Sequence, residues 1–161
     1  MNKKEKLSKK SGCWEKFMDN QLIQHIQSAN IRPCVLSSGD NAETIVLIGN
    51  RIAETVLPRL DCQILLVPGE RERDFPQICA KTIVTYGLSQ KDSITISSVS
   101  ADELVLAIQR EMRTLSGQKI EEQEIPLPLC AGKSLEDCLF LYAAFVLLDA
   151  KMFIPSFALP A

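Results

Sequence analysis

The stretch Cys62-Gln-Ile-Leu-Leu-Val67, which ends at Pro68-Gly69, decides the fold class of this chain more than any other segment. Its nearly unbroken apolar character is typical of a strand that is covered on both faces in a parallel sheet. The segment Lys81-Thr-Ile-Val-Thr-Tyr86, ended by Gly87, predicts another strand of the same sheet. Because helical patterns surround these strands, the sequence predicts an α/β fold, with a mainly parallel sheet flanked by helices.

The helices are predicted from apolar residues that recur every three or four positions. The first runs from Trp14 to Ala29, and a short strand, Pro33–Gly39, follows it. A longer helix is predicted from Ala42 to about Leu60, with an Asp or Asn just before it as the N-cap. A short helix is expected within residues 71–80.

The second half of the chain predicts an antiparallel β extension of the sheet. Residues 93–99 alternate between apolar and polar side chains, as a strand with one solvated face does. Segments 104–110 and 120–129 are predicted as strands joined by a turn at Ser116-Gly117, although 104–108 fits a helix equally well. Ser134 is predicted to cap a final helix that runs to residue 148.

Composition indicates one packed domain, which we place at residues 14–151. The 161 residues are 46% hydrophobic and 24% charged, with a net charge of −2. This is enough apolar surface to exclude disorder over most of the chain. The weak negative charge excludes an overall basic nucleic-acid binder, so no nucleic-acid partner is expected. Residues 1–13 are predicted to be a flexible basic tail.

We expect a cytoplasmic protein without a membrane span. No apolar run follows the lysine-rich start, as a secretory signal would require. The longest apolar run, 138–148, is much shorter than the roughly 20 residues that cross a bilayer.

The cysteines indicate core packing rather than a metal site. Six cysteines form no CxxC pair and the chain has one histidine, so no metal site is predicted. Those in apolar stretches are expected to be reduced core thiols, namely Cys34, Cys62, Cys79 and Cys138.

The triplet Gly132-Lys133-Ser134 stands before the final helix, where a phosphate-binding loop would end. That motif requires a glycine at position 127, which is Leu here, and Pro126 and Pro128 stiffen the segment. We therefore predict a capped helix start, with no ATP bound and no cofactor. Since neither a GxSxG motif nor a Cys/His pairing is present, no catalytic residue is predicted.

Two loops are better candidates for binding a small ligand, because both follow predicted strands at their carboxyl ends. The ligand-binding candidates are Ser37, Ser38, Gly39 and Asn41 in the first loop and Gly69, Arg71 and Arg73 in the second. Backbone N–H groups at a helix N-terminus and two arginines suit an anion. The alternatives are a simple helix cap at Asp40 and a solvated loop of mutually paired ions at 70–74.

A resemblance to a known family covers residues 62–149. Ile64–Gly69 is followed by Ala80-Lys-Thr-Ile-Val-Thr-Tyr-Gly-Leu88, the strand Asp92–Val99, Gln123-Glu-Ile-Pro-Leu-Pro-Leu129 and the helix Leu135–Leu148. This order resembles the second half of the central domain of the Mur ligases, the ATP-dependent amino-acid-adding enzymes of cell-wall synthesis. The most specific piece is Thr85-Tyr86-Gly87-Leu88.

The resemblance implies a bacterial, reduced relative that has lost the ATP chemistry. Ser37–Asn41 has no lysine where the family has its ATP loop, and Pro68–Arg71 stands where the family has an asparagine and two aspartates. Lys133-Ser134 replaces the His-Asn pair before the last helix. No catalytic residue is carried over.

The sequence therefore predicts a non-catalytic binding or interaction domain. The alternative is a small nucleotide- or anion-binding enzyme with its site at the carboxyl ends of the strands.

Residues 152–161 are predicted to be an apolar C-terminal tail, because they contain no charged side chain. Its anchoring residues are predicted to be Phe153, Ile154 and Phe157, because prolines at 155 and 160 keep it from extending the helix. The tail is predicted either to pack onto the chain's own sheet or to form an interface with a second copy or another protein, and membrane contact is a third alternative.

Deletion of residues 152–161 distinguishes these alternatives. Since full burial of each large apolar side chain stabilises by roughly 1.5–3 kcal/mol, internal packing predicts a lower melting temperature. An interface instead predicts a lower mass in light scattering while the monomer stays folded. A truncated protein with unchanged stability and mass would contradict both.

Overall fold

The computed structural model of the chain describes residues 20–37, 43–53 and 59–148. These residues form one sheet of seven strands in the order β1-β2-β3-β4-β5-β6-β9, and a pair of short strands, β7 and β8. The strands are β1 Cys34–Ser37, β2 Thr44–Leu47, β3 Leu60–Pro68, β4 Ile78–Tyr86, β5 Ile94–Val99, β6 Glu103–Ile108, β7 Met112–Arg113, β8 Lys119–Ile120 and β9 Gln123–Pro128. The helices are α2 Asn20–Ser28, the 3-10 helix η2 Gly69–Asp74 and α3 Leu135–Leu147.

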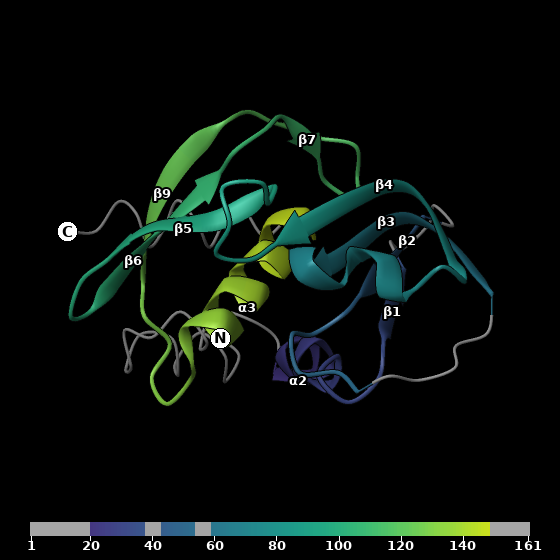
Figure 1. Cartoon of the computed structure of the whole chain (residues 1–161), viewed down its shortest axis with the longest axis horizontal. Coiled ribbons are helices and arrows are strands. Elements are labelled where there is room, and N and C mark those ends of the chain that lie inside the picture. The colour runs from purple at the N-terminus through teal and green to yellow at the C-terminus, as the bar shows by residue number, and fades with distance from the viewer. Residues whose placement is uncertain (1–19, 38–42, 54–58, 149–161) are drawn as a thin grey trace, which may run out of the picture.

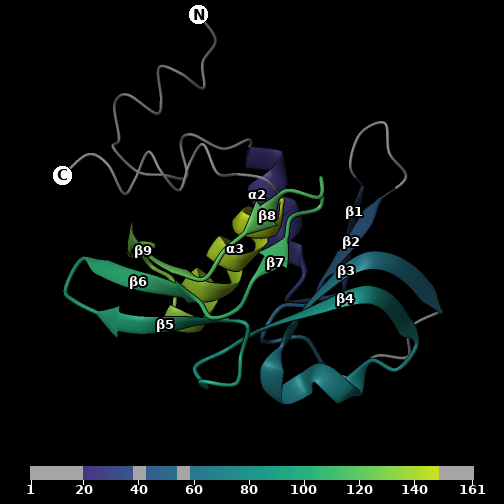
Figure 2. The same ribbon diagram turned by 90° about the horizontal axis from the view of Figure 1, so that it is seen from above.

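The sheet is mixed and curls around α3 (Figure 1). Only the pairings β2–β3, β3–β4 and β4–β5 are parallel, whereas β1–β2, β5–β6, β6–β9 and β7–β8 are antiparallel. Figure 2 shows β5, β6 and β9 on one side of α3 and β1 to β4 on the other. The prediction of a mainly parallel sheet flanked by helices was therefore wrong.

Both described α-helices pack into the same core. Ile23 and Ile26 of α2 belong to the buried cluster that surrounds α3. The other face of β2–β4 carries a second buried cluster. It includes Phe75, which follows η2, and Ile52, which follows β2. Among the residues that the structure describes, loop side chains cover this face and no α-helix does.

The predicted helix 42–60 is the main local error, since β2 occupies its first part and residues 54–58 lie outside the described ranges. Ile45 and Leu47 face the core around α3, whereas Val46 and Ile48 face the second cluster. A strand that is buried on both faces satisfies all four side chains, which a single apolar helix face does not. β-Branched residues at 44–46 favour the extended backbone as well.

The two strands predicted from 62–67 and 81–86 are confirmed as the parallel neighbours β3 and β4, paired from Leu60↔Ile78 to Pro68↔Tyr86. The short helix predicted within 71–80 is replaced by η2, after which β4 begins at Ile78. The strand at 104–108 is confirmed over its helical alternative, because β6 pairs with β5 and β9. Gly117, with φ of 92°, lies in a turn as expected, but this turn joins the short strands β7 and β8 and not the strands predicted at 104–110 and 120–129.

The final helix is confirmed together with its cap. Ser134 Oγ accepts a hydrogen bond of 3.1 Å from the Asp137 N–H. All residues from Cys138 to Leu147 are buried, so α3 is apolar on every side. In the described part of the chain, no helix is long and apolar enough to cross a membrane.

The remaining predictions on cysteines and termini have mixed outcomes. Cys34, Cys62 and Cys138 are buried as expected, but Cys79 is exposed, because it pairs with the exposed Asp61 at the start of β3. The beginning of the predicted helix 14–29, the basic tail 1–13 and the apolar tail 152–161 lie outside the described residues.

Tyr86 couples the sheet to its surroundings and provides a test of the fold. Its hydroxyl donates a 2.7 Å hydrogen bond to the Ile48 carbonyl, its ring packs 5.2 Å from that of Phe140, and burial raises the pKa of the phenol. We expect Tyr86→Phe to lower the free energy of unfolding by about 1–3 kcal/mol, because it leaves a buried carbonyl without this donor. Urea unfolding checks this, with Leu88→Ala, at a residue 56% exposed, as a control of little effect. Equal stabilities for Tyr86→Phe and the wild type would contradict the hydrogen bond.

Candidate functional site

A cleft of about 620 Å³ lies at the carboxyl ends of β3 and β4. Its walls come from the ends of these two strands, from the loops that follow them, from the residues after β2 and from the first turns of α3. The lining residues are Asn50, Pro68, Gly69, Glu70, Tyr86, Gly87, Leu88, Ser89, Lys91, Asp92, Glu136 and Leu139.

Two glycines make room for a carboxylate at the base of this cleft. Gly69 directly follows β3 and Gly87 directly follows β4. A Cβ at Gly69 would overlap Asp92 Oδ1, and a Cβ at Gly87 would overlap Asp92 Oδ2. Any larger residue at either position therefore displaces the Asp92 side chain.

The loop between β4 and β5 holds Asp92 in place. Asp92 as a residue is only 6% exposed. Its Oδ2 accepts a 3.1 Å hydrogen bond from the Ser89 N–H, and Gln109 Nε2 donates to the Asp92 carbonyl at 2.8 Å. The Ser89 N–H is the one hydrogen-bond donor to this carboxylate within residues 20–37, 43–53 and 59–148. An ionised carboxylate has about four acceptor sites, so Asp92 has acceptor capacity left for a ligand.

Asn50 also lines the cleft. Its Oδ1 is buried and has no hydrogen-bond partner among the described residues. Such an atom carries a desolvation penalty until a donor reaches it. The lining also includes the carboxylates of Glu70 and Glu136 and the amine of Lys91. With Asp92 the lining holds three carboxylates and one ammonium group, so the field in the cleft favours a cation.

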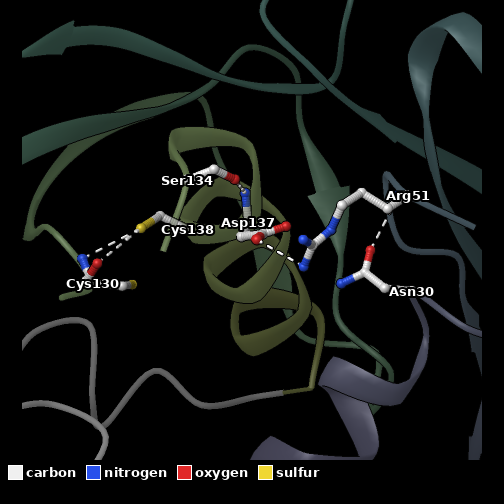
Figure 3. Close-up of polar contacts among 6 residues, drawn as sticks. All are labelled: Asn30, Arg51, Cys130, Ser134, Asp137 and Cys138. Carbon is white, nitrogen blue, oxygen red and sulfur yellow. Dashed lines mark hydrogen bonds and ion pairs between the residues drawn. The ribbon is translucent and has the colours of Figure 1, made fainter. Parts of the chain in front are cut away.

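An ion pair between Arg51 and Asp137 joins the residues after β2 to the first turn of α3 (Figure 3). Arg51, next to Asn50, places Nη2 3.0 Å from Oδ2 of Asp137, next to Glu136. The Arg51 N–H also donates to Asn30 Oδ1 at 3.1 Å, which joins the same loop to the end of α2. The cleft wall thus depends on three elements that meet at the N-terminus of α3.

The structure does not bring the two sequence-predicted loops together. Ser37 pairs with Thr44 at the start of β2, because β1 runs antiparallel to β2. Since β2 and β3 are parallel, Ser37 lies at the amino ends of these strands, and Gly69 lies at the opposite edge of the sheet. Ser38, Gly39 and Asn41 lie outside the described residues.

The second predicted loop contributes one residue to the cleft. Gly69 lines it, but Arg71 has a structural role: Nε is 3.0 Å from Asp74 Oδ2, Nη1 donates to the Ile52 carbonyl, and the guanidinium lies 5.3 Å from the Phe75 ring centroid. Arg73 is exposed on η2. For Arg71, the alternative of a loop of mutually paired ions at 70–74 is therefore the correct one. Phe153, Ile154 and Phe157 of the proposed interface lie outside the described residues.

Sequence reasoning missed Asn50, Gly87 and Asp92 as site residues. The one signal for them was that Gly87, like Gly69, directly follows a strand of the same parallel pair. No sequence motif marks Asp92. Its carboxylate reaches Gly69 and Gly87 only because of the way the β4–β5 loop folds, which the sequence pattern does not predict. In the described part of the chain, no cluster of three His, Cys, Asp or Glu side chains is arranged to hold a metal ion.

Comparisons with known proteins add no relative. No family model, no curated protein and no solved structure matches this chain.

The contact between Gly87 and Asp92 generates a double-mutant test. We expect Gly87→Ala to destabilise the protein by about 1–3 kcal/mol, because the added methyl overlaps Oδ2. In an Asp92→Ala background the same change should cost less by at least about 0.5 kcal/mol, since the overlapping atoms are gone. Chemical unfolding of the four proteins measures this coupling. Additive effects would show that the two residues are not in contact.

Proposed function

We propose that this chain is a non-catalytic binding domain that holds a small molecule with a protonated amino group in the cleft at the carboxyl ends of β3 and β4. The observation that carries the proposal is the carboxylate of Asp92, a residue 6% exposed that lines the cleft and whose carboxylate has one hydrogen-bond donor among the described residues.

The energetics of burial support a cationic ligand. A carboxylate that is removed from water is stable only when charge and hydrogen bonds compensate for the lost hydration. The chain supplies one donor to Asp92, so an ammonium group with its N–H donors complements what is missing. Asn50, whose buried Oδ1 has no hydrogen-bond partner among the described residues, lines the same cleft.

The rest of the lining supports a ligand with a hydrocarbon part. Leu88, Leu139 and the Tyr86 ring provide apolar surface beside the polar groups. A volume of about 620 Å³ falls within the range of small-molecule sites. Histidine and cysteine, which most often serve as general base or nucleophile at neutral pH, do not occur among the cleft residues that the structure describes. This lining favours binding over catalysis.

The Mur ligase resemblance over residues 62–149 stays a hypothesis, as do the cytoplasmic location and a contact with a second copy or another protein through Phe153, Ile154 and Phe157. These rest on the sequence patterns described above. The alternative is a nucleotide- or anion-binding enzyme with its site at this edge of the sheet, and the ligand screen below includes probes for it. The three carboxylates in the lining would repel a phosphate.

A thermal-shift screen tests the proposal with two matched sets of probes. One set contains alkyl diamines, spermidine and amino-acid amides, and the other contains sulfate, Mg-ATP and a uridine diphosphate sugar. A ligand at 100 times its Kd stabilises by about 2.7 kcal/mol, which corresponds to a rise of several degrees. We expect such a rise from members of the amine set only.

Variants assign the effect to the cleft. Asp92→Asn keeps an oxygen acceptor for the Ser89 N–H but removes the charge, so it should abolish the amine-induced shift. Asp61→Asn, at an exposed carboxylate at the other end of β3, is the matched control and should leave the shift unchanged. Stabilisation by the anionic probes, or an amine effect that survives Asp92→Asn, would overturn the proposal.

A further inference from the structure

Two cysteines that are not among the residues lining the cleft meet where the chain enters α3. Cys130 follows β9, and Cys138 lies in the first turns of α3. The Cys130 N–H donates a 3.3 Å hydrogen bond to Cys138 Sγ, and the Cys138 thiol lies 3.9 Å from the Cys130 carbonyl oxygen (Figure 3). Both side chains are buried, at 4% and 1% exposure.

The surroundings of Cys138 differ from those of the other buried thiols. Hydrogen bonds from the Cys130 side chain and backbone, together with the charge of Lys133, lower the pKa of the Cys138 thiol to about 7. Burial instead raises the pKa of the Cys34 and Cys62 thiols. The thiolate is the reactive form of cysteine, so a lowered thiol pKa favours reaction at this pair.

We propose that Cys130 and Cys138 are a redox modification site, a dithiol that hydrogen peroxide closes to an intramolecular disulfide. The hydrogen bond from the Cys130 N–H to Cys138 Sγ places the Cys138 sulfur against the residue that carries the other sulfur, and a disulfide joins the two sulfurs at about 2.0 Å.

The reaction balances with peroxide as the oxidant. The Cys138 thiolate attacks one peroxide oxygen, the O–O bond breaks, and the products are a sulfenic acid and hydroxide. The Cys130 thiolate then attacks the Cys138 sulfur, the S–O bond breaks, and a second hydroxide leaves as the disulfide forms. The two protons from the thiols convert both hydroxides to water. Two molecules of a small thiol such as glutathione reopen the bond and become its disulfide.

The covering segment is short and lies at the surface. Ala131, Gly132 and Ser134, in the segment between the two cysteines, are exposed. Hydrogen peroxide is little larger than water and needs only a local opening of this segment to reach Cys138. The disulfide would tie this segment to α3 beside the Ser134 cap and the Asp137–Arg51 ion pair.

Peptide mapping tests the site directly, because trypsin cleaves after Lys133, between the two cysteines. We expect brief peroxide treatment of the full chain, followed by alkylation and digestion without reductant, to yield peptides 120–133 and 134–151 as one linked species. Its mass should be two hydrogens below the sum of the separate peptides, and glutathione should separate it. The oxidised protein should also melt several degrees higher, since a closed loop restricts the unfolded chain.

Matched variants complete the test. Cys130→Ser and Cys138→Ser should each abolish the linked species, whereas Cys79→Ser, which removes an exposed thiol, should leave its yield unchanged. Separate peptides after oxidation, a Cys138 that ends as sulfinic acid, or a bond from either cysteine to Cys13 or Cys79 would overturn the proposal. The wild-type map decides the question by itself if a serine variant does not fold.

Discussion

The fold depends on one constraint: helix α3 has no polar face. Every residue from Cys138 to Leu147 is buried, so the helix has to be covered all round its axis. The curled sheet provides most of this cover, with β1–β4 on one side and β5, β6 and β9 on the other, and α2 adds Ile23 and Ile26 (Figures 1 and 2). Because the sheet curves round the helix, the N-terminus of α3 comes to the carboxyl ends of β3 and β4, where it forms one wall of the cleft.

The sequence predicted the elements whose pattern is local. The apolar runs of β3 and β4 and the Ser134 cap with the apolar helix behind it are such patterns, and the structure confirms all three. The segment 42–60 failed because Ile45, Ile48 and Ile52 recur at a spacing that suits a helix, yet their burial comes from two different cores. Which core a residue faces is a property of the tertiary structure, and periodicity along one segment does not contain it.

The candidate site was less predictable than the fold, for a related reason. The expectation that two loops share one edge assumed that the first strand runs parallel to the others. β1 is antiparallel to β2, which moves Ser37 to the opposite edge from Gly69. Asp92 enters the site because β4 and β5 pair only at Tyr86↔Ile94, so the loop between them folds back over the ends of β3 and β4. Nothing in the residues 87–93 taken singly predicts that register.

The charge of the cleft follows from how the chain neutralises its own helix terminus. The N-terminus of α3 would attract an anion through its unpaired N–H groups and its dipole. In this protein Ser134 Oγ accepts from the Asp137 N–H, and the carboxylates of Glu136 and Asp137 occupy the first turn. Arg51, the nearest arginine, is paired with Asp137. One N–H group at the positive end of the helix is thus capped within the chain, and the charged residues that line the cleft are Glu136, Glu70, Asp92 and Lys91. An anion entering here meets a terminus that is already capped, whereas an ammonium group meets acceptors that still lack donors.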